Sequence, residues 1–141
     1  MNLKYRLILE DYDDAAIALW VSGAQLKKMI RYMLRDEVWD GSHCEFFQFS
    51  AGMKVVYDKT NRELVEFSLN GEPINEEKIY KIGLQYYFYL NMKDFFSVTH
   101  EEIANNGKPR RIATSCREVL DEFLSCQQNL DHQISGRLII V

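Results

Sequence analysis

Residues 46–58 constrain the fold of this chain more than any other part of the sequence. They begin with Phe46-Phe47-Gln48-Phe49, a run that would place aromatic side chains on both faces of an extended segment. Gly52 then gives the backbone the freedom to turn, and the run that follows it is rich in β-branched and aromatic residues, which favour strands. The segment therefore predicts two neighbouring strands, at about residues 45–50 and 52–58.

The composition of the chain is typical of a globular domain. Of its 141 residues, 47% are hydrophobic and 27% are charged, so one compact domain spanning residues 1–141 is expected. The formal net charge of −4 argues against binding of a nucleic-acid polymer, which would need a basic face on the protein. No apolar run approaches the length of a membrane span, and the first residues do not open a signal peptide. We therefore expect neither a nucleic-acid polymer nor a membrane as a partner.

A helix is predicted directly after a short strand at residues 16–21. Ser22 can accept a hydrogen bond at the start of this helix, and Gln25 lies three residues on, where a capping box requires glutamine or glutamate. Apolar residues then recur at helical spacing, so the helix, expected over Gly23–Arg35, should bury one face. The residues of this face are Leu26, Met29, Ile30, Met33 and Leu34. The polar residues 36–44 predict a loop.

Three more strands are predicted from β-branched and aromatic runs bounded by turn residues. They are expected at residues 63–69, 78–86 and 136–141, with turns at Lys59–Arg62 and Asn70-Gly71. The run Tyr86-Tyr87-Phe88-Tyr89 lies at the end of the strand expected at residues 78–86. Because side chains alternate across a strand, two of these four rings should be buried and two should face outward.

Two more helices are predicted from capping signals. Thr99 with Glu102 marks the start of a short helix that Gly107 would end, and Ser115 with Glu118 marks the start of a longer one. The inner face of the longer helix would carry Val119, Leu120, Phe123 and Leu124. Strands and helices do not alternate regularly. We therefore expect an α+β fold, with a mixed or antiparallel sheet packed by two main helices and one short helix.

The sequence offers no residues for metal-dependent or nucleophilic catalysis. A two-metal phosphoesterase needs clustered Asp, His and Asn ligands, and none of the three histidines lies in such a setting. Asp11, Asp13 and Asp14 form the densest carboxylate cluster, but they lack the spacing and the glycine of a calcium loop. The histidines, His43, His100 and His132, are interpreted as surface residues. We expect no catalytic residue, no metal site and no cofactor on this chain.

The number and spacing of the cysteines indicate in which cellular compartment the protein is expected. Cys44, Cys116 and Cys126 are an odd number, and no two of them form a Cys-x-x-Cys pair. This spacing argues against a zinc site and predicts three free thiols that are buried or half-buried. Free thiols favour a reducing compartment such as the cytoplasm.

Five short motifs follow one another in the order and spacing of a known family. They are Gly23-Ala24-Gln25-Leu26, Val55-Val56-Tyr57-Asp58, Leu69-Asn70-Gly71, Tyr80-Lys81-Ile82 and Ser135-Gly136-Arg137. From about residue 9 to its end, the chain therefore resembles the C-terminal domain of the 5′-nucleotidase, UDP-sugar hydrolase and 2′,3′-cyclic-nucleotide phosphodiesterase family.

The resemblance implies that catalysis and nucleoside binding belong to two different domains. In this family an N-terminal metallophosphoesterase domain carries divalent metals and hydrolyses nucleotide phosphate esters, while the C-terminal domain holds the nucleoside. This chain would then be a substrate-recognition domain without a cofactor, and the catalytic domain would be absent from it. Its partners would be a nucleoside or nucleotide and that N-terminal domain. Because family members are often periplasmic or on the cell surface, the compartment stays open between these and the cytoplasm.

The resemblance also implies which residues would hold the nucleoside. Two aromatic rings sandwich the base in the family, and alignment places the first on Phe47 and the second on Phe95, with Phe96 one step away. The family's carboxylate that holds the ribose hydroxyls aligns with Glu101, and Asp14 occupies the position at which the family has asparagine. One ring of the Phe95–Phe96 pair is expected in the core and the other is expected to be exposed.

Part of the family pattern is missing, and two functions therefore stay open. The family's Gly-Gly-Asp-Gly-Phe loop is replaced by Asn91-Met92-Lys93-Asp94-Phe95, and the arginines that meet the phosphate have no secure counterpart. The first function is a nucleoside- or nucleotide-binding domain of a 5′-nucleotidase-type phosphoesterase. The alternative is a binding or interaction module that keeps the fold but has lost nucleotide recognition. A self-sufficient small enzyme has no supporting residues.

Overall fold

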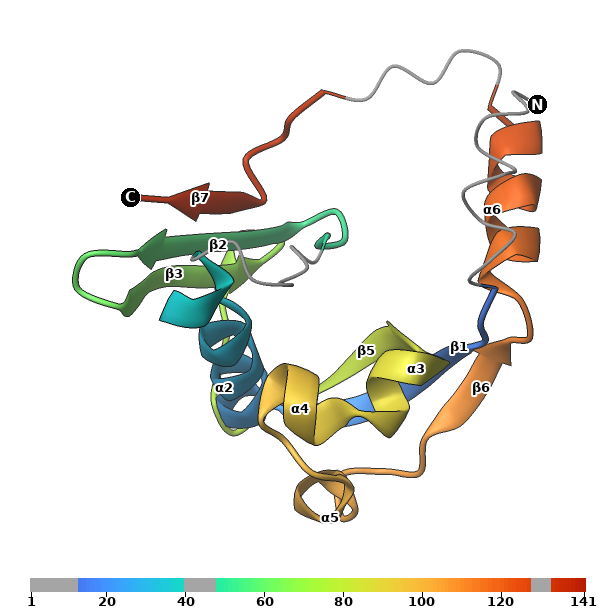
Figure 1. The fold of residues 1–141 in the computed structure, drawn as a ribbon, viewed down its shortest axis with the longest axis horizontal. Helices are drawn as coiled ribbons and strands as arrows, with labels where there is room; N and C mark the ends of the chain where they lie inside the picture. Colours follow the sequence, from blue (N-terminus) through green and yellow to red (C-terminus); the bar gives the residue numbers. More distant parts are fainter. Residues whose placement is uncertain (1–12, 40–47, 128–132) are drawn as a thin grey trace.

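One helix, α2, connects two separate β-sheets at the centre of the fold (Figure 1). The computed structural model describes residues 13–39, 48–127 and 133–141. In chain order, the elements are β1 (Ala16–Ser22), α2 (Gly23–Met33), the 3₁₀ helix η1 (Asp36–Val38), β2 (Met53–Asp58), β3 (Glu63–Leu69), β4 (Glu72–Pro73), β5 (Ile79–Gln85), α3 (Tyr86–Leu90), α4 (Met92–Phe96), α5 (His100–Ile103), β6 (Arg110–Ala113), α6 (Cys116–Ser125) and β7 (Leu138–Ile140).

The two sheets differ in their strand directions. In the first sheet the strand order is β5-β1-β6, and β1 pairs antiparallel with both neighbours. In the second sheet the order is β4-β3-β2-β7, where β7 pairs parallel with β2 and the other pairs are antiparallel. The expected α+β class with antiparallel and mixed pairing is confirmed, and the strands are divided between two sheets.

The predicted strand–helix junction at Ser22 is confirmed. Ser22 Oγ accepts a hydrogen bond from the backbone N–H of Gln25 at 3.2 Å, and Gln25 Oε1 accepts one from the backbone N–H of Ser22 at 2.8 Å. This capping box satisfies donors that the first turn of α2 would otherwise leave unpaired. Of the predicted inner face, Leu26, Met29, Ile30 and Leu34 are buried and Met33 is partly buried. These side chains form the core with apolar residues of both sheets.

Gly23 allows the loop after β4 to lie directly against α2. Its backbone N–H donates to the carbonyl oxygen of Lys78 at 2.9 Å, and the next N–H, of Ala24, donates to that of Glu76 at 3.0 Å. A Cβ on Gly23 would lie 1.9 Å from the carbonyl oxygen of Asn75, a separation that no real side chain could accept. This close approach therefore requires glycine at position 23.

The two predicted turns of the second sheet are confirmed. Residues 59–62 connect β2 to β3, and Asn70-Gly71 connects β3 to β4. Both residues of the second turn have positive φ angles, 53° and 83°, as a tight two-residue hairpin turn requires. Gly52, with φ of 85°, precedes β2, and its carbonyl oxygen accepts a hydrogen bond from the N–H of Asn70 at 2.8 Å.

The prediction that Tyr86–Tyr89 ends a strand was wrong. β5 ends at Gln85, and the four aromatic residues begin the helix α3. The N–H of Tyr86 donates to the carbonyl oxygen of Ala15 at 2.7 Å, and the N–H of Tyr87 donates to Asp14 Oδ2. Both acceptors lie directly before β1, and Asp14 is 73 residues from Tyr87, so no local pattern could indicate them. The next segment, Asn91–Phe95, expected to be a loop, is mostly the helix α4.

The predicted inner face of the helix that follows Ser115 was also wrong. Ser115 does cap α6, because its Oγ accepts from the N–H of Glu118 at 3.0 Å. However, no residue of α6 is fully buried, and Val119 and Phe123 are 51% and 47% exposed. In Figure 1 the helix projects from the end of the first sheet. Its apolar face is therefore not part of the core that the structure describes.

Three smaller differences concern strands and turns. Residues 48–50, the described part of the strand expected at 45–50, are not a strand, and residues 45–47 lie outside the described residues. The expected loop at 36–44 begins with η1. β6 was not predicted from the sequence, because its residues Arg110-Arg111-Ile112-Ala113 carry two charges and only one β-branched side chain. β6 exists because it pairs with β1 at the edge of the first sheet.

Candidate functional site

A polar cavity of about 330 Å³ lies where α4 and α5 begin. Its walls come from two stretches of chain, one at the junction of α3 and α4 and the other at the start of α5. The lining residues are Leu90, Asn91, Lys93, Asp94, Thr99, His100 and Glu101. The cavity thus brings together the segment aligned with the family's base-binding loop and the residue aligned with its ribose-binding carboxylate.

The start of α5 is held by a capping box and by two contacts from α2. Thr99 Oγ1 accepts from the N–H of Glu102 at 3.3 Å, and Glu102 Oε2 accepts from the N–H of Thr99 at 2.7 Å. Gln25 Nε2 donates to the carbonyl oxygen of Glu102 at 2.7 Å, and Lys28 Nζ lies 2.9 Å from Glu102 Oε1. Lys28, followed by the N–H of Thr99, holds the pKa of Glu102 below its ordinary value. The Glu102 side chain therefore has a structural role, because its contacts hold the start of α5 in place.

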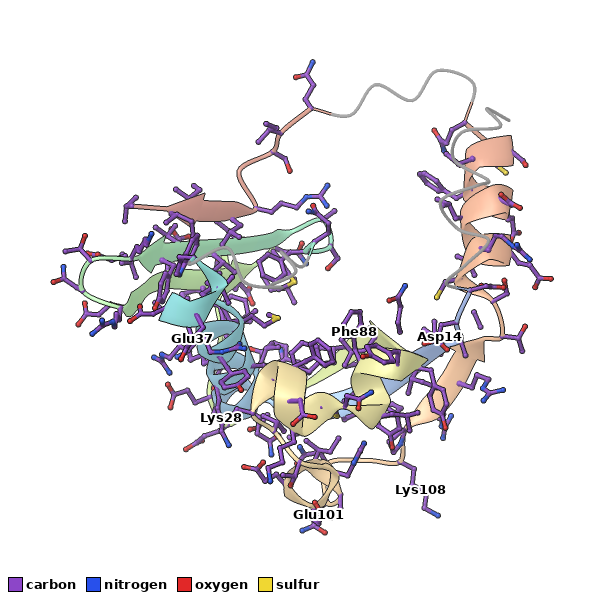
Figure 2. All side chains as sticks on the ribbon, in the orientation of Figure 1. Asp14, Lys28, Glu37, Phe88, Glu101 and Lys108 are labelled. Atoms are coloured by element: carbon purple, nitrogen blue, oxygen red, sulfur yellow. The ribbon has the colours of Figure 1, made fainter. Side chains whose placement is uncertain are left out.

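Glu101 is exposed, as Glu102 is, but of the two only Glu101 lies on the cavity wall (Figure 2). Hydrogen bonds from its own backbone N–H and from the Thr99 hydroxyl lower the pKa of Glu101 below its ordinary value of 4.5. At neutral pH it is therefore ionised and acts only as a hydrogen-bond acceptor. Such a group suits a ligand that presents hydroxyl donors.

His100 links the cavity to α3. One of its ring nitrogens, Nε2, lies 2.9 Å from the carbonyl oxygen of Tyr89, and the two rings meet edge to face with centroids 4.7 Å apart. From the sequence, His100 was interpreted as a surface residue, and neither Thr99 nor Leu90 was assigned to a site. The available signal for His100 was its position between the cap Thr99 and Glu101, at the first turn of a predicted helix.

The structure places Phe95 and Phe96 in different surroundings. Phe96 is 1% exposed, so the expected core ring of the pair is Phe96. Phe95 is half-buried rather than fully exposed, and its ring meets Tyr87 at 5.6 Å and Phe88 at 5.0 Å, in both cases edge on. Neither phenylalanine lines the polar cavity, although α4 carries both Phe95 and the cavity residues Lys93 and Asp94. Phe47 lies outside the described residues.

Asp14 lies at the entry to β1, away from the polar cavity's lining (Figure 2). Its Oδ1 accepts from the N–H of Ala15 at 2.7 Å, and its Oδ2 accepts from the N–H of Tyr87. The side chain thus satisfies an unpaired donor in the first turn of α3. Asp14 positions the helix that leads into the cavity.

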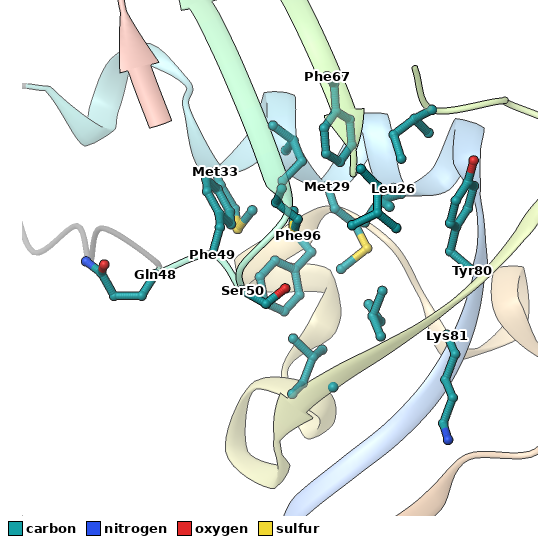
Figure 3. A pocket seen from close by; sticks show the side chains of 17 residues that line it. Leu26, Met29, Met33, Gln48, Phe49, Ser50, Phe67, Tyr80, Lys81 and Phe96 are labelled. Atoms are coloured by element: carbon teal, nitrogen blue, oxygen red, sulfur yellow. The ribbon is translucent and has the colours of Figure 1, made fainter. Parts of the chain in front are cut away.

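A second cavity, of about 400 Å³, lies in the apolar interior between α2, β3 and β5 (Figure 3). Most of its lining is aliphatic, aromatic or thioether, including Met29, Met33 and Phe96. Gln48, Ser50 and Lys81 contribute the polar side chains labelled in Figure 3 besides Tyr80. This cavity is continuous with the core, and none of the described residues that line it carries a carboxylate to hold ribose hydroxyls.

The described residues contain neither a cluster of metal ligands nor a membrane-spanning helix. In residues 13–39, 48–127 and 133–141, no three His, Cys, Asp or Glu side chains gather as they would around a metal ion. None of the helices in the same part of the chain is long and apolar enough to cross a membrane. Cys116 and Cys126 are free thiols, and burial, followed by the charges of Asp14 and Asp13, raises the pKa of Cys116.

Two sheets bridged by a helix, with a polar cavity at the start of two short helices, define a small α+β domain. A family model described as the 5′-nucleotidase, C-terminal domain, matches residues 9–101. The chain therefore belongs to the family of 5′-nucleotidase C-terminal domains.

The fold agrees with this membership. The crystal structure of the 5′-nucleotidase precursor from Thermus thermophilus is similar, with a TM-score of 0.70 and 16% sequence identity. The similarity covers 91% of this chain and 25% of that one, so this chain spans about a quarter of the length of that protein. No curated protein sequence matched significantly.

Proposed function

We propose that this chain binds the nucleoside part of a nucleotide at the polar cavity, as the recognition domain of a 5′-nucleotidase-type phosphoesterase. One observation carries the proposal. Asn91, Lys93 and Asp94 line the same cavity as Glu101, although the resemblance assigned the first three to a base-binding loop and the last to a ribose contact. The loop and the carboxylate, which one alignment placed along the sequence, thus line one cavity.

The chemistry of the cavity fits a ribose. An ionised carboxylate such as Glu101 can accept hydrogen bonds from two adjacent hydroxyl groups, and charged hydrogen bonds are stronger than neutral ones. Asn91 and Thr99, on the same walls, can both donate and accept. With Lys93 positive and Asp94 and Glu101 negative, the wall has no excess of positive charge to attract a phosphate. The cavity thus suits a nucleoside, and phosphate recognition would fall to another domain.

The base would stack on aromatic rings. Phe95 lies on α4, which also carries the cavity residues Lys93 and Asp94, and its ring meets that of Tyr87 on α3. Phe47 is the first ring that the resemblance assigns, and Phe95 is the second. Each stack contributes about 1–3 kcal/mol. Two stacks therefore give about 2–6 kcal/mol before the entropy cost of association, which corresponds to a dissociation constant of roughly millimolar or weaker.

Hydrolysis would be catalysed by an N-terminal metallophosphoesterase domain, which would carry the divalent metals. Support comes from the family, whose name places this domain at the C-terminus of 5′-nucleotidases, and from the similar crystal structure, of which this chain spans a quarter. In this arrangement the present domain orients the nucleotide so that its phosphate reaches the metals.

The test is an NMR titration of the chain with adenosine. Shifts should be found at residues 90–101, with Glu101→Gln weakening the response and Glu72→Gln, an exposed glutamate on β4, leaving it unchanged. The same protein should not hydrolyse adenosine monophosphate when divalent metals are added. Shifts confined to another surface would reject the nucleoside site.

The alternative, an interaction module without nucleotide recognition, is favoured by a different observation. Tyr87 and Leu90, next to the cavity, are 56% and 53% exposed, and exposed large apolar side chains are typical of protein contacts. If adenosine causes no shifts but Leu90→Asp abolishes binding to a purified N-terminal domain, the interaction module is the better description.

A further inference from the structure

The outer edge of β5 has no strand partner among the residues that the structure describes. β5 is the end strand of the first sheet and pairs on one side only, with β1. Two hydrogen bonds bracket this pairing: the N–H of Tyr86 donates to the carbonyl oxygen of Ala15 at 2.7 Å, and the N–H of Gly23 donates to that of Lys78 at 2.9 Å. Because bonded and non-bonded pairs alternate along an antiparallel ladder, the even-numbered residues of β5 direct their backbone groups toward β1. The odd-numbered residues direct theirs toward the open edge. These residues are Ile79, Lys81, Gly83 and Gln85.

The apolar cavity between α2, β3 and β5 runs along this open edge. Five consecutive residues of β5, 80–84, line the cavity, although neighbouring side chains of a strand point to opposite faces. Figure 3 shows Tyr80 and Lys81 on opposite sides of β5. A cavity lined by both kinds of residue must border the edge at which the two faces meet. Tyr80, Ile82 and Leu84 pack against the core only in part, so some of their apolar surface is accessible from this edge.

An extended polypeptide segment is the ligand that fits both features. Unpaired backbone donors and acceptors on a strand edge are satisfied by another strand, and an adjoining groove receives the alternate side chains of that strand. Residues that lie opposite each other in a sheet point to the same face, so the residues opposite Tyr80, Ile82 and Leu84 would enter the cavity. The cavity volume of about 400 Å³ lies within the range of about 300–1,000 Å³ that is typical of ligand pockets.

Gly83 keeps the middle of this edge unobstructed. A Cβ atom at this position would have no neighbouring atom within 4 Å, so there is open space beside the backbone. Glycine within a strand often marks a place where another backbone approaches closely. An incoming strand would therefore meet no side chain at this position.

The charge of the edge distinguishes between possible partners. The Nζ atoms of Lys78 and Lys81 lie 5.4 Å and 5.9 Å from the ring centroids of Tyr80 and Trp20, and neither lysine makes an ion pair with a described residue. A second copy that paired through its own β5 would bring the same two lysines to the shared edge, where like charges are unfavourable. A segment with an acidic residue opposite Lys81 would be attracted instead.

We propose that β5 binds an extended segment of a partner protein, which adds to the open edge as a fourth strand of the first sheet. Apolar side chains at alternate positions of this segment enter the cavity, and an acidic side chain between two of them lies beside Lys81. The site is independent of the proposed nucleoside site, because no described residue lines both cavities.

Amide hydrogen exchange of the free protein tests whether the edge is open. The N–H groups of Ile82 and Leu84 point toward β1 and should exchange slowly, whereas those of Lys81 and Gly83 should exchange about tenfold faster or more. Slow exchange of all four groups that persists on dilution would show that the chain itself covers the edge. Slow exchange that disappears on dilution would show that a second copy covers it. Either result would overturn the proposal.

A synthetic peptide tests the strand addition. The probe has seven residues and is blocked at both ends, with valine at positions 2, 4 and 6, glutamate at position 5 and threonine elsewhere. In antiparallel pairing its valines lie opposite Tyr80, Ile82 and Leu84, and its glutamate lies opposite Lys81. NMR titration should shift the amide resonances of residues 79–85, and saturation should slow exchange at Lys81 and Gly83 about tenfold or more. A peptide of the same composition with its valines consecutive should bind about tenfold more weakly or worse, because it cannot place all of them in the cavity.

Two substitutions at Gly83 separate the edge from the rest of the fold. Gly83→Pro removes a donor that points outward and places a ring in the path of the segment, so peptide binding should weaken about tenfold or more. Gly83→Ala keeps the donor and adds a methyl group in open space, so binding should be retained. A cooperative thermal melt shows that each variant is folded.

Lys81→Glu provides a second test that leaves the backbone unchanged. It should reverse the preference between the glutamate peptide and a peptide with lysine at position 5, because the charge beside that position changes sign. Equal binding by the Gly83→Pro and Gly83→Ala proteins would overturn the proposal. Peptide shifts that are absent or confined to other surfaces would do the same.

Discussion

Gln25 Nε2 donates a hydrogen bond of 2.7 Å to the backbone carbonyl oxygen of Glu102, across 77 residues of sequence. The same side chain accepts from the N–H of Ser22 at 2.8 Å and from Asn106 Nδ2 at 2.7 Å. One amide group therefore closes the first turn of α2 and holds the chain at Glu102, directly after Glu101, and again at Asn106. The position of the polar cavity depends on this residue.

Gln25→Ala should lower the free energy of unfolding by about 1–3 kcal/mol, because it removes a cap and leaves partners unsatisfied. Urea denaturation measures the change. Gln133→Ala, at an exposed position, is the matched control and should have almost no effect. A Gln25→Ala protein as stable as the control would show that these hydrogen bonds are replaced by water at no cost.

Leu26→Asp should destabilise the fold severely. Leu26 is 8% exposed and lies in the core, and placing an unpaired carboxylate there costs several kcal/mol, on the order of a third or more of a domain's stability. Ala24→Asp introduces the same side chain on the exposed face of the first turn, where the helix dipole favours negative charge. Thermal melting should separate the two variants widely. Similar melting temperatures would mean that the buried face of α2 is wrongly assigned.

Phe47→Ala should abolish the response of the protein to adenosine. One of two stacking rings is lost, and a site with a dissociation constant of roughly millimolar becomes too weak to detect when about 1–3 kcal/mol is removed. Chemical-shift titration measures the effect, and Phe49→Leu, which retains an apolar side chain, provides a comparison. An unchanged titration of Phe47→Ala would remove Phe47 from the site and leave Glu101 to be tested alone.

Asp13 should make α6 sensitive to acid. The Ser115 hydroxyl and then the N–H of Arg117 lower the pKa of Asp13 below its ordinary value of 3.8. A carboxyl with a lowered pKa in the folded state stabilises it above the unfolded pKa, and this contribution is lost as the pH falls through the folded pKa. Exchange protection of residues 116–118 should therefore decrease below about pH 4, and Asp13→Asn should weaken that dependence. If both proteins respond to acid alike, Asp13 does not hold α6.

The sequence predicted the elements whose signals are local. Ser22 and Gln25 formed the capping box that their spacing indicated, and the Asn70-Gly71 turn followed from residues that tolerate positive φ angles. Tyr86–Leu90 became a helix because Ala15 and Asp14 supply acceptors from the far end of the chain. No window of sequence around the four aromatic residues contains that information.

The candidate site was predictable in a similar, partial way. Glu101 and the segment 91–95 were placed by resemblance, and their meeting at one cavity depends on how α5 is anchored to α2 through Gln25 and Lys28. The role of His100 in linking α5 to Tyr89 was not predicted, because its ring contacts a backbone oxygen 11 residues away. The assignment of Phe47 stays a prediction.

The arrangement of α2 also has a consequence for cooperativity. The two sheets have separate hydrogen-bond ladders, so among the described residues no strand pairing transmits the loss of one sheet to the other. Yet α2 contacts β1 in the first sheet and β3 in the second, and its buried side chains belong to a single core. Opening either sheet removes part of the surface on which the helix rests, and the helix then supports the other sheet less well. The domain should therefore unfold in one step, with α2 as the element through which its halves share their stability.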